Sequence, residues 1–446
     1  MTAPPVPAKP LRPPLTIQPA APPARAPRPP PVAGPWRLRT LMAAPHRLGF
    51  CLAMLVMVAA SAWWLLAQAE RALGWPALAY AVPPSVTHAT VMVFGFMPLF
   101  FSGFLFTAGP KWLHVAPYGT PRLLPPLALQ AAGWLLWLAG AHLSLGLALA
   151  GLALACAGLA WMYGLFWRLI AASTQADRVH ALAAGVGGIV GTLCLAGSGA
   201  ALPAGQPALA LALVRAGLWG CVVVTFVAVA HRMIPFFTAS ALPRVAAWRP
   251  FWVLWLMLGV AAFEVLAVWV DHAAPSADAW PGWTVAVIVV EAAGGGALLW
   301  LALVWGLARS LKIRLLAMLH VGFTWLGLSL LYSAASQALW LATGQALLGL
   351  GALHALSMGF LGSLMVAMVT RVSCGHSGRA LVADDLVWAL FWLLQVTVGV
   401  RLLAAVQGMP AWLTALAALL WLAVVGAWAL RCGNWYGRPR VDGQPG

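Results

Sequence analysis

The sequence predicts an all-α membrane protein: a bundle of about twelve transmembrane helices with both termini in the cytoplasm. Two observations predict the helical bundle. The chain of 446 residues is 63% hydrophobic and only 8% charged, whereas about 25% of the residues in a soluble domain are charged. Apolar stretches of about 20 residues, the length of a membrane-spanning helix, recur from Gly49 to Arg431. They are too long and too continuously apolar for barrel strands, whose hydrophobicity alternates.

The distribution of basic residues predicts the number and orientation of the spans, because Lys and Arg are enriched in cytoplasmic connections. The N-terminal tail, the C-terminal tail and alternate connections hold 22 of the 25 lysines and arginines, whereas the opposite connections hold only Arg71. This alternation requires an even number of spans. We expect them near 49–69, 85–108, 123–142, 145–170, 180–200, 208–231, 251–270, 283–307, 314–334, 347–370, 386–406 and 411–431.

Three regions follow from this pattern: a disordered, basic, Pro-rich cytoplasmic tail (1–45), a twelve-helix transmembrane domain (46–433) and a short cytoplasmic tail (434–446). Residues 1–35 contain 14 of the 34 prolines, and a stretch of this composition cannot bury a core. This stretch has no apolar region followed by a cleavage site, so we expect no cleaved signal peptide. The first span would then serve as the insertion signal.

Several classes of protein lack their sequence signatures here. The six cysteines are scattered without a CxxC pair, so neither a disulfide framework nor a zinc site is indicated. The Walker A pattern of ATP-driven proteins is missing from the sequence. The +16 net charge reflects the loop bias and contact with anionic lipid, and nothing else supports a nucleic-acid role. We interpret GVGGIVG at 185–191 as small residues that allow close helix packing.

Four charged residues lie within the expected spans, namely Arg215, Glu264, Glu291 and Arg401. Charge at membrane depth is costly and marks candidate functional sites. In the predicted orientation all four fall in the periplasmic half, where we expect them to face the bundle interior. They could form ion pairs with one another. Alternatively, the arginines could hold anionic groups of a cofactor, such as haem propionates, while a glutamate handles protons.

Two inward-running spans begin with the pattern His-x-x-x-Met. It occurs as HATVM, with His88 and Met92, and as HALSM, with His354 and Met358. A spacing of four places both side chains on one helix face, and imidazole and thioether groups are ligands for haem iron and copper. A lone histidine in a bundle is more often a hydrogen-bonded packing residue. Because the pattern is repeated, we predict that His88 and His354 converge on one metal or haem iron.

Histidines on the predicted cytoplasmic side define further candidates. His231 ends one span and His320 begins another, so they form a second candidate metal site. His376 lies in CGHSGR close to Arg379, where glycines permit turns that point backbone N–H groups inward. These two residues are expected either to fix the end of a helix or to form a second site that binds an anion, an anionic cofactor or a metal. We interpret the remaining histidines as mainly interfacial: His46, His114, His142, His180 and His272.

Three segments resemble the NnrS family. HALSMGFLGSLMVAMVTRVSCGHSGRAL (354–381) resembles its pattern of a His-Ala start, glycines, Met-x-x-x-x-x-Arg and Gly-His-Thr-Gly-Arg. HATVMVFGFMPLFFSGFLFTAGPKW (88–112) resembles its His-Ala helix with GF, TA and a Pro-x-Trp turn, and RMIPFFT (232–238) resembles a third signature. The segments occur in the expected order, so the resemblance extends over the membrane region and leaves out the Pro-rich tail.

The resemblance implies a multi-pass protein of the bacterial inner membrane that contains haem, with copper as a further metal. It also implies a role in protection from, or response to, nitric oxide and nitrosative stress in denitrification. The family's helix-starting histidines match His88 and His354, and its loop motif matches Gly375, His376, Gly378 and Arg379. Thr90 stands where the family commonly has a second histidine, and Ser377 replaces a threonine. If the missing histidine is a ligand, this chain binds one metal fewer or none.

Two other functions fit the same sequence. Twelve spans, short connections and paired buried charges suit a secondary transporter of a small molecule or ion, although prolines within spans are few and a six-span repeat is not evident. A membrane assembly or scaffold protein would use the 26 tryptophans to hold partners, but tryptophan is also expected at lipid interfaces. The sequence designates no catalytic residue and leaves open whether the protein is an enzyme. Metal stoichiometry and oligomeric state are likewise open.

Overall fold

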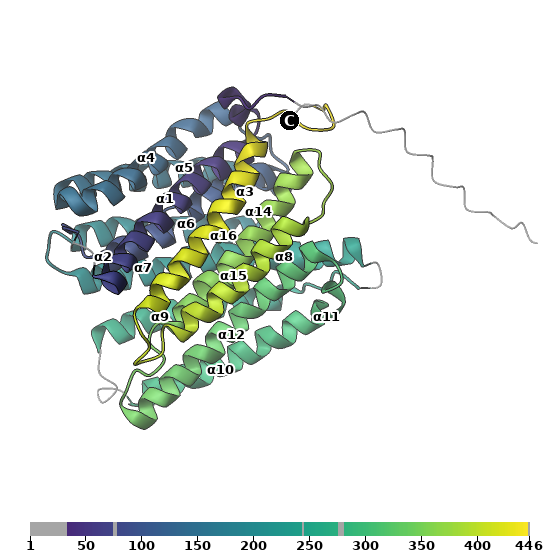
Figure 1. Ribbon diagram of the computed structural model, residues 1–446. Helices are drawn as coiled ribbons and strands as arrows, with labels where there is room; N and C mark the ends of the chain where they lie inside the picture. The colour runs from purple at the N-terminus through teal and green to yellow at the C-terminus, as the bar shows by residue number, and fades with distance from the viewer. Residues whose placement is uncertain (1–33, 75–77, 243–244, 275–280, 445–446) are drawn as a thin grey trace, which may run out of the picture.

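The computed structural model describes residues 34–74, 78–242, 245–274 and 281–444, and every regular element in these ranges is helical (Figure 1). In chain order the elements are η1 (Leu38–Ala43), α1 (Pro45–Leu73), α2 (Pro84–Phe94), α3 (Met97–Leu113), α4 (Thr120–Leu143), α5 (Leu145–Ala172), α6 (Val179–Ala201), α7 (Pro207–Gly217), η2 (Leu218–Val223), α8 (Val224–Ala241), α9 (Phe251–Ala273), α10 (Pro281–Val304), α11 (Leu307–Ser310), α12 (Arg314–Thr343), α13 (Gly351–His354), η4 (Ala355–Gly362), α14 (Ser363–His376), α15 (Asp385–Leu403) and α16 (Trp412–Tyr436).

The prediction of twelve spans is confirmed, because the described residues contain twelve helical segments that are long and apolar enough to cross a membrane. The first runs over Pro45–Leu73, where the sequence predicted 49–69, and the tenth over Gly351–His376, where it predicted 347–370. Most helices extend beyond the predicted span. The extra turns are more polar, as expected for helix ends that leave the hydrocarbon layer.

Small residues set the spacing between several helices. In the α4–α5 pair, a methyl group at Gly133 would press against the backbone of Ala155, and one at Gly151 would press against the backbone of Trp137. Two further glycines of the pair, Gly140 and Gly158, are enclosed in the same way. Such close approach is how helices gain packing energy in lipid, where apolar burial alone does not drive association.

Three spans are interrupted, although few prolines lie within spans. The second breaks between α2 and α3 at Gly95, the sixth contains the π-helical segment η2, and the tenth contains the π-helical segment η4. In the most apolar windows of these spans, 78%, 61% and 72% of the residues are buried. These spans therefore contribute much of the bundle interior. Irregular helix is tolerated at membrane depth where protein, not lipid, surrounds it.

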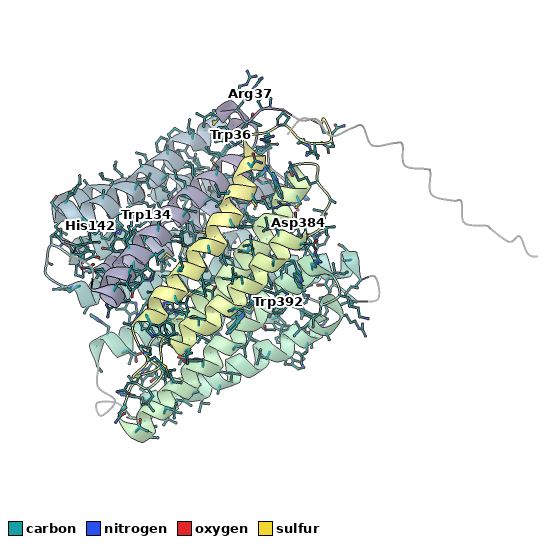
Figure 2. All side chains as sticks on the ribbon, viewed as in Figure 1. Trp36, Arg37, Trp134, His142, Asp384 and Trp392 are labelled. Atoms are coloured by element: carbon teal, nitrogen blue, oxygen red, sulfur yellow. The ribbon has the colours of Figure 1, made fainter. Side chains whose placement is uncertain are left out.

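Both described ends of the chain lie at the same end of the bundle. The indole of Trp36 donates a hydrogen bond to the carbonyl of Gly433 (3.1 Å), and the amide of Arg37 donates to the carbonyl of Gly437 (2.7 Å). Figure 2 labels Trp36 and Arg37 beside the C-terminal segment. The guanidinium of Arg47 in α1 donates to the carbonyls of Tyr436 and Arg438. Most of the predicted disordered tail, residues 1–33, lies outside the described residues.

The side of the membrane that holds the termini is a prediction, for which reporter fusions provide the test. We expect a C-terminal alkaline phosphatase fusion to be inactive, because this reporter needs the oxidising periplasm to form its disulfides. The same reporter inserted after Ala273 should be active, because the sequence predicts a periplasmic Ala273–Asp278 connection, of which 275–278 lies outside the described residues. A strongly active C-terminal fusion would reverse the predicted orientation.

Candidate functional site

His88 lies near the start of α2, at the end of the bundle opposite to the termini. Its ring stacks on the indole of Trp64, with ring centroids 3.7 Å apart and planes inclined by 16°. Among the described residues, the buried Nδ1 of His88 has no hydrogen-bond partner. His354 and Arg401 are both close enough to His88 to interact with it electrostatically. The structure thus places Arg401 near the two histidines, which the sequence predicted to converge.

His354 is the last residue of α13, where the tenth span changes into the π-helical segment η4. Its Nδ1 lies 2.8 Å from the carbonyl oxygen of Leu350. Since a carbonyl only accepts hydrogen bonds, Nδ1 carries the proton and Nε2 carries the free lone pair. A backbone carbonyl that fixes a histidine in this way is typical of metal-binding histidines, and π-helical turns often occur at functional sites.

The two methionines of the repeated pattern differ in burial and in the kind of helix that carries them. Met92 is half-buried in α2, and Met358 is buried inside η4. The spacing of four that aligned His354 with Met358 assumed an α-helix, whereas η4 has the wider π-helical turn. Ligation by either methionine stays a prediction. In the described part of the chain, no three His, Cys, Asp or Glu side chains group to hold a metal ion.

The second candidate pair, His231 and His320, has separate partners. His231 Nε2 lies 3.1 Å from the carbonyl of Pro250, and its Nδ1 lies 3.0 Å from Nε2 of His180. Nε2 of His231 must therefore donate, and its Nδ1 accepts from His180. Both nitrogens of His231 are engaged, so metal binding there would require one of these bonds to break. His180, which the sequence suggested was interfacial, is buried.

His320 is fully buried and bonds to Thr238, two turns of α8 beyond His231. The Thr238 hydroxyl donates to the carbonyl of Ile234 (2.8 Å), so it accepts from Nε2 of His320 (2.9 Å). Nδ1 of His320 then carries a free lone pair, and it has no partner among the described residues. A metal site shared by His231 and His320 stays a prediction, and the observed bonds do not favour it.

His376 lies beside a histidine whose involvement the sequence did not indicate. Its ring centroid is 4.5 Å from that of His46, which is buried at the start of α1. Both histidines line a cavity of about 630 Å³ at the end of the bundle that holds the termini, together with Lys111 and Tyr118. The two histidines are 330 positions apart in the sequence, one at the start of α1 and the other at the end of α14.

The turn after His376 is fixed by the C-terminal tail. The amide of Val441 donates to the carbonyl of Ser377 (3.0 Å), and Arg440 forms an ion pair with Asp442 (2.6 Å). This pairing lowers the pKa of Asp442 to about 2. Gly378 has φ +74°, and a methyl group there would meet the Asp442 carboxylate. The segment from His376 to Arg379 thus ends helix α14 against the C-terminal tail. This is the arrangement expected if the segment fixes the end of a helix.

Arg379, the other residue of that motif, packs against an aromatic ring. Its guanidinium carbon lies 4.6 Å from the ring centroid of Trp435 in α16. Its Nη1 is buried without a hydrogen-bond partner among the described residues. Cofactor binding by His376 and Arg379 remains a prediction, and these contacts give Arg379 a structural role as well.

The four charged residues within the spans divide into two groups. Arg215, Glu264 and Glu291 line one cavity, together with Asp271, which the sequence did not single out. Arg401 lies instead near His88, His354 and Tyr332. The candidate cofactor role of Arg401 therefore has histidine neighbours, whereas Arg215 faces carboxylates.

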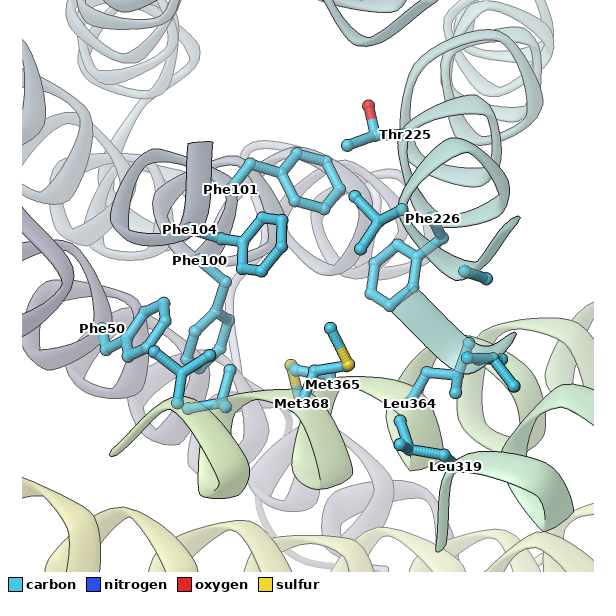
Figure 3. Close-up of a pocket in the computed structure, with 15 residues that line it drawn as sticks. Phe50, Phe100, Phe101, Phe104, Thr225, Phe226, Leu319, Leu364, Met365 and Met368 are labelled. Atoms are coloured by element: carbon cyan, nitrogen blue, oxygen red, sulfur yellow. The ribbon is translucent and has the colours of Figure 1, made fainter. Parts of the chain in front are cut away.

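An apolar cavity of about 60 Å³ lies between the interrupted spans (Figure 3). Phe101 of α3, Phe226 of α8 and Met365 of α14 face it, and Met368 lines it as well. The lining is almost wholly apolar, so the cavity would not hold an ion, and apolar cavities of this kind stay dry. Met365 and Met368 thus pack in the apolar centre of the bundle.

The twelve spans and their interrupted central helices define a polytopic α-helical membrane protein. A family model described as NnrS protein matches residues 40–440. The chain therefore belongs to the NnrS family. None of the curated proteins matches the chain.

Proposed function

We propose that the protein binds haem between His88 and His354 and acts in the response to, or protection from, nitric oxide in the bacterial inner membrane. The observation that carries the proposal is the cluster of His88, His354 and Arg401 at one end of the bundle. A porphyrin supplies four ligands to its iron, so two histidines complete the coordination. The lack of a three-ligand group among the described residues is therefore compatible with haem.

Each residue of the cluster has a defined task in this proposal. The hydrogen bond from His354 to Leu350 fixes the ring so that Nε2 presents its lone pair, and such a bond also raises ligand basicity. Trp64 holds the ring plane of His88 by stacking. Arg401 provides positive charge for anionic propionate groups. Bound haem would supply an iron that exchanges single electrons.

Copper is proposed as a further metal, and nitric oxide or a related small molecule as the partner. The thioethers of Met92 and Met358 are soft ligands that suit Cu(I). The apolar cavity between Phe101, Phe226 and Met365 suits an uncharged molecule of a few atoms. Family membership supports both assignments.

A secondary transporter is the second candidate, favoured by the interrupted spans. Transporters commonly place their substrates at broken helices in matched halves. Here the interruptions occur in the second, sixth and tenth spans. These are four spans apart, so they do not correspond between two six-span halves, and the haem proposal is better supported.

An absorption spectrum of the purified full-length protein tests the proposal. We expect a Soret band and about one haem per chain when the protein is produced in haem-replete cells. Elemental analysis of the same sample measures copper. A pure, folded sample without a Soret band, which also fails to bind added haemin, would refute haem binding.

A further inference from the structure

The polar cavity around Glu264 and Glu291 is not lined by His88, His354 or Arg401, and its two glutamates have no task in the proposed haem site. Its volume is about 240 Å³, and its walls come from α7, α9, α10, α12 and the start of the tenth span. Glu264 is 8% exposed and Glu291 is 3% exposed, and both line the cavity. Arg215 and Asp271 also line it and are exposed.

The two glutamates are neighbouring acids whose negative charge has no paired basic side chain among the described residues. They are close enough to interact electrostatically, and Oε1 of Glu264 and Oε2 of Glu291 are buried without partners among the described residues. Arg215 is the one basic side chain in the described lining, and it interacts with Asp271 nearer the rim. Two buried carboxylates without a positive partner are costly, so a cation or protons must compensate them.

Helix α12 adds neutral oxygen atoms to the same cavity. Ser329, Ser333 and Ser336 follow each other at spacings of four and three, which places them on one helix face, and all three line the cavity. The hydroxyl of Ser329 donates to the carbonyl of Leu326 (2.8 Å), which leaves its oxygen lone pairs free. Carboxylate, hydroxyl and water oxygens are ligands of Mg²⁺ and Ca²⁺, whereas copper prefers nitrogen and sulfur.

We propose that this cavity binds one hydrated divalent cation of the Mg²⁺ or Ca²⁺ class, held by Glu264 and Glu291 and assisted by the serines of α12. Two carboxylates suffice, because Mg²⁺ usually keeps several of its waters and binds through one or two protein carboxylates. The cavity has room for those waters. Asp271 lies seven residues beyond Glu264 on α9, two turns nearer the rim, and its carboxylate would attract the cation towards the buried pair.

Thermal unfolding of the full-length protein tests this site. The protein is purified in an uncharged detergent, because anionic lipid would itself bind divalent cations, and is treated with EDTA. We expect millimolar Mg²⁺ or Ca²⁺ to raise the unfolding midpoint, since a ligand that binds only the folded state stabilises it. In Glu264→Gln and Glu291→Gln the metal-free midpoint should rise, because repulsion is removed, and the shift caused by metal should be lost.

Glu70→Gln is the matched control. Glu70 is at the same end of the bundle, but its carboxylate already accepts hydrogen bonds from Tyr80 and from the amide of Leu78. We expect this variant to keep the full metal shift. Equilibrium dialysis with Ca²⁺ should give one ion per chain, and none in the Glu264→Gln/Glu291→Gln variant. If the double variant does not fold, Ser333→Ala must weaken Ca²⁺ binding several-fold.

Two outcomes would overturn the proposal. The first is a wild-type protein that shows no metal shift and binds no Ca²⁺, which would mean that protons compensate the glutamates. The second is a metal shift that persists in the double variant, or Ca²⁺ binding unchanged in Ser333→Ala, which would place the cation elsewhere. Neither result depends on haem, whose absorbance is measured separately on the same samples.

Discussion

Replacing His354 by alanine is expected to remove the haem absorbance of the purified protein. The hydrogen bond of its Nδ1–H to Leu350 leaves Nε2 as the free donor atom, so the substitution deletes one complete ligand. His88→Ala should have the same effect, because both histidines are proposed to hold the haem. The measurement is the ratio of Soret to protein absorbance, with helix content checked by circular dichroism.

His142→Ala is the control for these substitutions. His142 lies at the same end of the bundle, but its Nε2 accepts from the indole of Trp63 (2.7 Å) and its Nδ1 bonds to the carbonyl of Ala79 (2.9 Å). Both nitrogens are engaged, so we expect this variant to keep its haem. Imidazole added to His354→Ala should partly restore the band, which a purely structural defect would not allow.

Unchanged spectra in both His88→Ala and His354→Ala would contradict the shared site. The remaining histidines would then have to provide the ligands, with His231 and His320 the first to test. Nδ1 of His320 has no partner among the described residues, but His231 would first have to release Pro250 or His180. This cost is why we propose the pair at the opposite end of the bundle instead.

The number of spans was predictable because the length of an apolar segment is fixed by the thickness of the bilayer. The boundaries were less accurate, since a helix continues past the hydrocarbon layer wherever its backbone stays paired. The break at Gly95 has a nearby signal in the sequence, Pro98. The π-helical segments η2 and η4 contain no proline that would indicate them. Those segments depend on tertiary packing around them, which a single sequence does not contain.

The spans that carry the charged residues could be predicted, but the grouping of these residues could not. Position along each span predicts that Arg215, Glu264, Glu291 and Arg401 lie in the same half of the membrane. Which helices are neighbours depends on the arrangement of the whole bundle, so the separation of Arg401 from the other three was not visible. Asp271 and His46 were missed because they lie near helix ends, where polar residues are common and carry little signal.

A substitution in the glycine-rich stretch at 185–191 is expected to have a large effect on stability, because this stretch lies on a tightly packed face of α6. A methyl group at Gly188 would overlap the ring of Tyr163 in α5, and one at Gly191 would press on Cys221. The ring of Tyr163 is only 2% exposed, so it has little room to move. This geometry confirms the interpretation of the stretch as a packing surface.

Gly188→Ala is therefore expected to destabilise the protein by about 1–3 kcal/mol, the usual cost of overpacking a core. The change would be measured as a lower unfolding midpoint and a smaller yield of monodisperse protein in mild detergent. Gly164→Ala is the matched control: it is the same substitution on the facing helix α5, one residue from Tyr163. The added methyl group would meet no atom of another described segment within 4 Å. It should leave the midpoint unchanged or raise it slightly, since alanine is the better helix former.

The double variant Gly188→Ala/Tyr163→Ala separates a steric clash from a change in helix propensity. Tyr163→Ala alone should be destabilising, because it leaves a cavity where a buried ring stood. If the clash with the ring causes the loss in Gly188→Ala, the two substitutions together should cost clearly less than the sum of their separate effects. If the two effects are strictly additive, α5 and α6 can move apart at this point without further cost. Close packing against Tyr163 would then not explain why glycine occupies position 188.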